Sequence, residues 1–211
     1  MMKRFAAVIT VLIMVLFLVG MVWAVEDDEY KYRAGLTATS KQDKDNWDVN
    51  TNLTIGAKAL DNDDWEPVES QVELGLNVDF AHKSWPFNFA IGILGSAIDK
   101  NDYFGTKVEG STSELRVGLK KIWEPTSKMR IYIGLGLAII NAKLKLGGHD
   151  DEVSDDDNGS GEYISGGIFW TLARHLNLGF ELGTSGATAT VFDYDTKAGG
   201  YHGLFLIGYH W

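Results

Sequence analysis

The stretch ESQVELGLNVDFAH, residues 69–82, alternates between polar and apolar side chains without a break. Its apolar positions lie two residues apart, at Val72, Leu74, Leu76, Val78 and Phe80. Successive side chains of a β-strand point to opposite faces of the sheet, so this pattern predicts a strand with one apolar and one polar face. A helix would need apolar positions three and four residues apart.

Seven more segments repeat the period of two, which makes eight predicted strands and an antiparallel, all-β protein. They are VNTNLTIGAKA from Val49, FNFAIGILGSAI from Phe87, SELRVGLKKIW from Ser113, RIYIGLGLAII from Arg130, YISGGIFWTLA from Tyr163, LNLGFELGTS from Leu176 and YHGLFLIGYHW from Tyr201. The connections alternate between short ones, such as EPTSK, and long acidic ones, such as LGGHDDEVSDDDNGSGE. Short turns at one end and long loops at the other are typical of an up-and-down transmembrane β-barrel, with the long loops outside the cell.

The chain opens with a segment of a different kind. Lys3 and Arg4 precede an uncharged apolar run from Phe5 to Trp23, which predicts a secretory signal peptide over residues 1–24, cleaved after Ala24. An uncleaved membrane anchor is the alternative. We expect residues 25–48 to be a periplasmic lead and residues 49–211 to be the barrel.

The sequence is also compatible with a second number of strands. The segment YKYRAGLTATS also alternates, and it predicts a possible extra strand over residues 30–40. Bacterial single-chain barrels have even strand counts. The alternative is therefore a ten-stranded barrel, in which Met129–Leu146 or Leu176–Val191 hides an additional turn.

Composition excludes several classes of function. The 211 residues carry a formal net charge of -10, and removal of Lys3 and Arg4 with the signal makes it -12. A chain this acidic has no electrostatic basis for binding nucleic acid. It contains no cysteine, so disulfides and thiolate metal sites are excluded.

The polar face of the strands decides between a membrane barrel and a soluble sandwich or lipocalin-like barrel. This face carries many glycines and isolated charges of both signs, which suit a narrow lumen better than a wet surface. We expect a buried charge network that fills the lumen of an eight-stranded barrel: Lys58, Glu73, Asp79, Glu114, Arg116, Lys120 and Glu181. Aromatic residues of the apolar face at strand ends predict a girdle at one membrane interface: Phe87, Trp123, Trp170, Tyr209 and Trp211.

The final strand, GLFLIGYHW, resembles the closing strand of small bacterial outer-membrane β-barrel proteins of the OmpA/OmpX transmembrane-domain type. Phe205, Ile207, Tyr209 and Trp211 are the alternating apolar residues, and the chain ends on an aromatic residue as in that family. The resemblance implies location in the bacterial outer membrane and recognition of this strand by the barrel assembly machinery. It also implies contact with outer-membrane lipid and lipopolysaccharide, and we expect a monomer.

Two leucines of this strand, Leu204 and Leu206, fall on the supposedly polar face. Either the lumen is apolar at that level, where Leu94 and Ile98 are expected to pack, or a β-bulge shifts the register.

Two groups of residues in the sequence have the side chains of a chemical site. The acidic segment around Asp155, Asp156, Asp157 and Glu162 could bridge a divalent cation weakly, but it lacks the EF-hand spacing and is expected to be a solvated loop. A hydrolytic site would need His202, expected to point inward beside Asp193 and Asp195, with Ser185 one strand back. No catalytic motif accompanies these residues, so we expect neither enzyme activity nor a cofactor or metal.

The sequence therefore predicts a non-enzymatic integral outer-membrane barrel, structural or surface-interacting, with a lumen filled by side chains and acidic extracellular loops. A barrel that transports small or apolar solutes and a lipid A-modifying enzyme are the alternative functions. A soluble periplasmic barrel is the alternative fold.

Overall fold

The computed structural model describes residues 46–101, 106–147, 153–172 and 175–210. The predicted signal segment 1–24, the possible strand 30–40 and Trp211 lie outside the described residues, as does most of the predicted lead 25–48. Those statements stay predictions.

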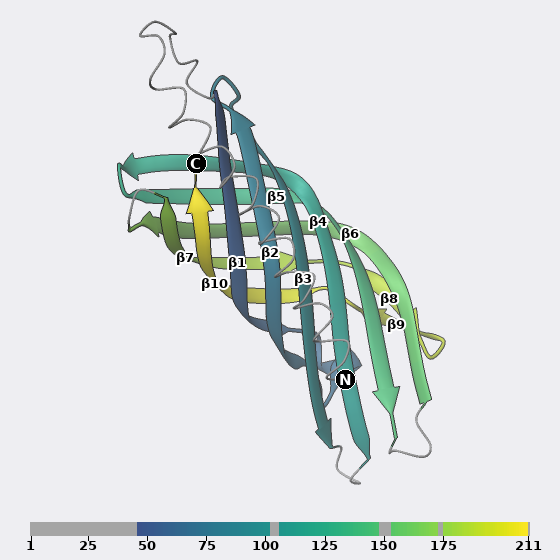
Figure 1. The fold of residues 1–211 in the computed structure, drawn as a ribbon. Helices are drawn as coiled ribbons and strands as arrows, with labels where there is room; N and C mark the ends of the chain where they lie inside the picture. Colours follow the sequence, from purple (N-terminus) through teal and green to yellow (C-terminus); the bar gives the residue numbers. More distant parts are fainter. Residues whose placement is uncertain (1–45, 102–105, 148–152, 173–174, 211) are drawn as a thin grey trace, which may run out of the picture. The chain divides into compact units, whose positions relative to one another are not determined.

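Eight antiparallel strands close into one ring. β1 pairs with β2 on one side and with β10 on the other, which joins the first strand of the barrel to the last (Figure 1). The predicted eight-stranded up-and-down barrel is confirmed, and its first strand begins two residues before the expected start at 49. The strands of the ring are β1 Trp47–Ala59, β2 Ser70–His82, β3 Asn88–Asn101, β4 Lys107–Thr126, β5 Met129–Leu146, β6 Val153–Thr171, β7 Leu176–Ser185 and β10 Gly200–His210.

The ten-stranded alternative is wrong for the described part of the chain. Met129–Leu146 is one uninterrupted strand, whereas Leu176–Val191 does contain a turn. The chain after that turn leaves the ring and forms a separate two-stranded hairpin of β8, Thr188–Val191, and β9, Tyr194–Lys197. Phe192 and Asp193 make its tight turn with φ values of 52° and 64°, as a two-residue hairpin turn of the primed type requires.

The strands are strongly staggered around the ring. From Ile55 the register of paired residues leads one way to Asn158 on β6 and the other way to Ile168, ten residues further along the same strand. A closed sheet with such a stagger has strands tilted by roughly 35–45° from the barrel axis. The tilt brings residues that are far apart in the sequence to the same level of the lumen.

The outer face of the ring is apolar. Leu137 is 71% exposed, Leu135 58% and Ile93 57%, and similar side chains cover every strand of the ring. A water-soluble monomer rarely exposes a continuous apolar surface of this kind. A closed ring pairs its backbone groups internally, as a hydrocarbon environment demands, so the barrel is of the transmembrane type. In the described residues no helix is long and apolar enough to cross a membrane.

The two rims of the barrel differ. One carries the connections 83–87 and 127–128, and we name it the short-turn rim. The other carries the β1–β2 connection 60–69 and the β8–β9 hairpin, and we name it the loop rim. β4, β5 and β6 are the longest strands, with 20, 18 and 19 residues. β4 extends beyond β3 at the short-turn rim, whereas β6 extends beyond β7 toward the loop rim, where its residues 153–162 pair with β5.

The expectation of a solvated acidic loop is wrong from residue 153 onward. Val153–Glu162 belongs to β6 and pairs with β5, where Asp156 lies opposite Lys143. The ammonium of Lys143 approaches the Asp156 carboxylate to 3.2 Å, so part of the negative charge that suggested a solvated loop is neutralised within the sheet.

Apolar side chains fill the two ends of the lumen. Toward the short-turn rim, Leu206 packs with Tyr132 and Phe169. Leu204 and Leu206 both point inward in an unbroken register, so there is no bulge and the lumen is apolar at these positions. The expected packing partner Ile98 belongs instead to the cluster at the other end of the lumen. Toward the loop rim lies a larger core, which Ile98 joins: Leu60, Trp65, Val68, Val108, Ala138, Ile140, Ala142, Tyr163, Ala189, Val191 and Ala198.

Candidate functional site

Charged side chains occupy the lumen of the barrel. The structure buries all seven residues that the sequence assigns to the lumen: Lys58, Glu73, Asp79, Glu114, Arg116, Lys120 and Glu181. They come from β1, β2, β4 and β7, and the tilt of the strands brings them together. An unpaired charge in such a site is strongly destabilising, so the pairing pattern matters more than the number of charges.

Glu114 is the centre of the first group. Its Oε1 accepts from Arg116 Nε at 2.6 Å and its Oε2 accepts from Lys58 Nζ at 3.3 Å. Arg116 also reaches Glu181 Oε1 at 3.6 Å, and Glu181 accepts a hydrogen bond from the Tyr132 hydroxyl at 2.5 Å. Four strands are thereby joined across the lumen.

Asp79 is the centre of the second group. Lys120 Nζ donates to its Oδ2 at 3.1 Å, and the amides of Asn50 and Asn88 donate to its Oδ1 at 3.0 and 3.1 Å. Lys120 Nζ also lies 4.4 Å from the centroid of the Tyr132 ring, a cation–π contact. The ammonium and the carboxylate are both solvated by protein groups instead of water.

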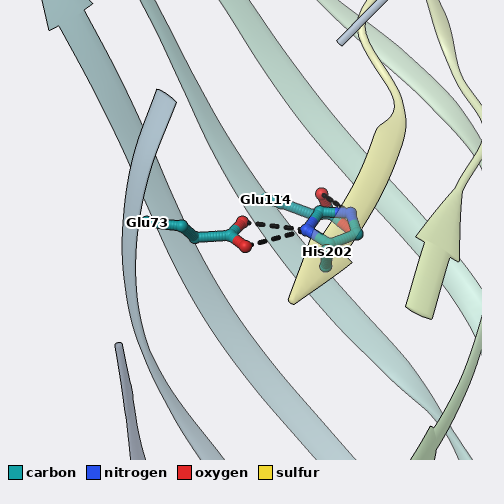
Figure 2. Close-up of side chains that lie close together, drawn as sticks. All are labelled: Glu73, Glu114 and His202. Carbon is teal, nitrogen blue, oxygen red and sulfur yellow. Dashed lines mark hydrogen bonds and ion pairs between the residues drawn. The ribbon is translucent and has the colours of Figure 1, made fainter. Parts of the chain in front are cut away.

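Glu73, the last of the four buried carboxylates of the lumen, contacts His202. The imidazole lies between two carboxylates (Figure 2), with Nδ1 2.9 Å from Glu73 Oε2 and Nε2 3.7 Å from Glu114 Oε2. The sequence singled out His202 but expected Asp193 and Asp195 beside it, which is wrong. Those two residues belong to the β8–β9 hairpin, whereas Glu73 on β2 faces His202 because of the stagger of the ring.

The described residues contain one group of three potential metal ligands of the His, Cys, Asp or Glu type. It consists of Glu73, Glu114 and His202, whose potential ligand atoms all lie within 4.8 Å of one another. Their arrangement does not suit a metal ion. The two carboxylates face opposite nitrogens of the ring, and the Lys58 ammonium already lies against Glu114. A cation there would have to displace Lys58.

Ser185, His202 and Glu73 form a Ser–His–Glu arrangement. Ser185 Oγ lies 2.9 Å from His202 Nε2, the contact that a nucleophile and its general base make. However, Ser185 and His202 are only 6% and 2% exposed, and Ser185 Oγ donates its proton to Glu114 at 3.2 Å. The serine therefore neither reaches a substrate nor gives its proton to the histidine.

The loop between β1 and β2 covers the loop rim. It carries a single helical turn, α2 Asn62–Trp65, and Trp65 is 1% exposed in the apolar core. Trp65 Nε1 donates to Lys197 O at 2.8 Å, and the Lys197 amide donates to Asp64 at 2.8 Å. The Lys197 ammonium hydrogen-bonds to Asp61, which lowers the pKa of the Asp61 carboxyl and raises the pKa of Lys197. The loop and the β8–β9 hairpin thus form one unit, which we name the cap.

The inner face of β6 holds the other side of the cap. Asp157 and Asp155 accept from the backbone amides of Thr190 and Phe192 at 2.8 and 2.6 Å. Asp156 and Glu162 lie on the opposite face of β6 from Asp155 and Asp157, so the four acidic residues do not gather at one point. Asp155 and Asp157 brace the hairpin instead, and Asp156 pairs with Lys143 of β5.

Two glycines allow the hairpin to lie against β6. A Cβ on Gly161 would fall 1.5 Å from Gly186 O, and one on Gly159 would fall 2.4 Å from Thr188 O. Only residues without a side chain permit this approach of two backbones.

Aromatic side chains gather at the short-turn rim. Of the predicted girdle, Phe87, Trp123, Trp170 and Tyr209 are all more than two-fifths exposed and lie at or next to strand ends of this rim. Two further residues, Trp47 and Trp85, belong to the girdle although the alternation did not predict them, and their rings pack edge to face at 5.3 Å. The stretch HKSWP held the signal for Trp85.

Two small cavities lie among the described residues. One of about 200 Å³ opens at the short-turn rim beside Asp48, His82 and Arg130. One of about 20 Å³ lies inside, beside Arg116 and Glu181, and has room for about one water molecule.

Solved structures of other proteins share this fold. A major outer membrane protein from Thermus thermophilus is similar with a TM-score of 0.57 at 9% identity, over 78% of this chain and 99% of that one. The fold is that of the small outer-membrane β-barrels. OprG from Pseudomonas aeruginosa is similar with a TM-score of 0.52 at 13% identity, over 78% of this chain and 95% of that chain.

A third outer-membrane barrel of this fold is Ail, the attachment invasion locus protein of Yersinia pestis, crystallised with the heparin analogue sucrose octasulfate. Its TM-score is 0.51 at 9% identity, over 78% of this chain and 97% of that one. No family model and no curated protein matches the chain. The predicted outer-membrane location is in agreement with the fold, and at these identities the similarity carries no activity.

Proposed function

We propose that this protein is a sealed, non-enzymatic outer-membrane barrel that acts as a structural or surface-interacting element. The observation that carries the proposal is the filling of the lumen. A polar network lies between two apolar clusters, and the internal cavity of about 20 Å³ has room for about one water molecule. The short-turn rim is then periplasmic and the cap faces outward.

Planar-bilayer recording tests the sealed lumen. The refolded full chain should give no stable conductance steps, while the same preparation shows the heat-modifiable gel mobility of a folded barrel and floats with lipid vesicles in a density gradient. Large, stable steps would contradict the proposal and favour the transport alternative.

The partners proposed for the barrel follow from its outer surface. The outward row of β5 changes from apolar to polar after Ile139, where Asn141, Lys143 and Lys145 follow. These side chains stand at the level of the outer-leaflet headgroups. Lys143 and Lys145 pair there with Asp156 and Glu109, so lipopolysaccharide phosphates would share these ammonium groups with carboxylates. Recognition of the last strand by the barrel assembly machinery and a monomeric state complete this proposal.

The surface charge of the cap bears on the choice of external partner. Asp61, Asp63 and Asp64 line the α2 loop, so a sulfated polyanion of the kind crystallised with Ail would meet like charge here. We expect no retention on a heparin column at low salt. Retention that salt reverses would contradict this part of the proposal.

The enzyme alternative is disfavoured by the burial of Ser185 and His202. Incubation of the refolded protein with lipid A should release no acyl chain. Release that disappears in His202→Ala would overturn the non-enzymatic assignment.

A further inference from the structure

One lysine lies on the lipid-facing side of the barrel wall near the short-turn rim. Lys121 belongs to the outward row of β4, between Leu119 and Trp123, whose side chains are 39% and 46% exposed. It lies opposite Ile133, an exposed residue of the outward row of β5. Among the outward rows of the described strands, Lys121 is the one lysine or arginine near this rim.

The side chain of Lys121 reaches from the apolar surface to the rim. Two residues separate it from Trp123, and in a tilted strand they place its Cα roughly 5 Å deeper in the membrane. Its Nζ nevertheless donates to Pro86 O at 2.7 Å, in the connection 83–87 of the rim. A long basic side chain that starts on an apolar surface and ends at the polar interface is snorkelling.

The ammonium of Lys121 has no carboxylate partner among the described residues. The lysines described at the loop rim each have one, in the pairs Lys100–Glu69, Lys107–Asp99, Lys143–Asp156, Lys145–Glu109 and Lys197–Asp61. The bond to Pro86 O uses one ammonium proton, and the Phe87 ring covers one side at 5.7 Å from its centroid. In the described part of the chain, two protons are left for an acceptor from outside the protein.

The surface around Lys121 indicates the chemistry of that acceptor. Phe89 and Ile133, beside and below it on the lipid-facing side, are 46% and 48% exposed. Such side chains contact acyl chains, whereas the ammonium at the level of the aromatic girdle needs an anion. A phospholipid supplies both in one molecule, because its phosphate oxygens accept charge-assisted hydrogen bonds and its acyl chains cover the apolar row.

The neighbouring charges favour an anionic headgroup over a zwitterionic one. Glu124, three residues further along β4, is paired with Arg130 at 2.7 Å and does not neutralise Lys121. A zwitterionic headgroup would bring its own ammonium close to that of Lys121. A headgroup whose only charge is the phosphate avoids this repulsion.

We propose that Lys121, Pro86 and Phe87 form a binding site for the phosphate of an anionic phospholipid in the leaflet at the short-turn rim. The acyl chains of the lipid lie over Phe89 and Ile133. The inference deepens the proposed contact of the barrel with outer-membrane lipid and rests on it. It does not depend on the sealed lumen.

NMR of the full chain in isotropic bicelles tests the site. The reporter is the indole N–H of Trp123, assigned from the signal lost in Trp123→Phe, and the indoles of Trp47 on β1 and Trp170 on β6 are internal references. As phosphatidylglycerol replaces phosphatidylcholine, the Trp123 signal should shift and saturate, while the references change weakly and without saturation. Inorganic phosphate at the same concentration should leave the Trp123 signal unchanged, because it brings no acyl chains.

Three variants test the role of the ammonium. Lys121→Gln should weaken the apparent affinity for phosphatidylglycerol about fivefold, the size expected for one basic residue next to an anionic membrane surface. Lys121→Arg keeps the charge and should keep the affinity. Lys128→Gln is the matched control, since Lys128 is exposed in the β4–β5 turn and also has no carboxylate partner among the described residues, and it should change nothing.

Several results would overturn the site. They are an unchanged titration in Lys121→Gln, an equal saturating shift of the Trp47 and Trp170 indoles, or the same shift with inorganic phosphate. A barrel without lipid contact gives a different result, because a lipid with a spin label in its headgroup would then broaden none of the three indole signals. Failure of the site is therefore distinguishable from failure of the proposed lipid partner.

Discussion

Replacement of Glu114 by glutamine should destabilise the barrel by about 3–5 kcal/mol, the cost of breaking a buried ion pair. Glu114 accepts hydrogen bonds from Arg116, Lys58 and Ser185. Glutamine keeps the shape and one acceptor oxygen but removes the charge. Arg116 retains Glu181, whereas Lys58 is left with only the neutral oxygens of Thr112 and Ala198.

The measurement is urea unfolding of the refolded protein in micelles, followed by gel mobility at equilibrium. The matched control is Asp156→Asn, the same change of acid to amide at a partly exposed pair with Lys143, where side-chain exposures of 24% and 49% predict a cost of at most about 1 kcal/mol. If the two variants lose equal stability, or Glu114→Gln loses less than about 1 kcal/mol, the argument that the buried network stabilises the barrel is refuted.

Three further outcomes follow from the structure. Gly161→Ala should destabilise the cap by about 1–3 kcal/mol and expose the hairpin to protease, while the barrel keeps its heat-modifiable mobility. The control Gly95→Ala has no atom within 4 Å of the added carbon, so it should leave both the stability of the cap and its protease resistance unchanged. Trp123→Phe should reduce the fluorescence quenching by lipids brominated near the headgroup, and unchanged quenching would contradict the girdle. The hydrogen bond from Lys197 lowers the pKa of Asp61. The pair therefore stabilises the cap above the ordinary carboxyl pKa of about 4, and this contribution is lost as pH falls through the lowered value. The protease sensitivity of the hairpin should rise on acidification in the wild type, whereas in Asp61→Asn it should be high at every pH.

The period of two was enough to predict the eight strands and the inward side chains, because parity along a strand decides which face a residue takes. It could not predict which inward residues meet. His202 and Glu73 are separated by 129 positions in the sequence, and they contact each other only through the stagger of the ring, which alternation does not encode. The expected partners, Asp193 and Asp195, were chosen for their proximity in sequence.

The acidic segment 153–162 shows a second limit. A run of carboxylates normally indicates solvent exposure. Here alternate carboxylates point to opposite faces, so Asp155 and Asp157 bind the hairpin while Asp156 pairs with Lys143. The β8–β9 hairpin was not predicted, because no pattern in the sequence indicates that the chain leaves the ring after β7 and packs against the inner face of β6.

The contacts of the cap impose an order on the assembly of the barrel. Trp65 and Asp64 near the start of the barrel bind Lys197, which lies 132 and 133 positions later in the chain. These bonds can form only when both ends of the barrel sequence are in place, which is also the condition for β1 to pair with β10. Loop closure over such distances carries a large entropic cost, so these contacts belong to the last steps of folding. A closed cap therefore marks a complete barrel. A barrel that has not yet joined its first strand to its last keeps an open outer end.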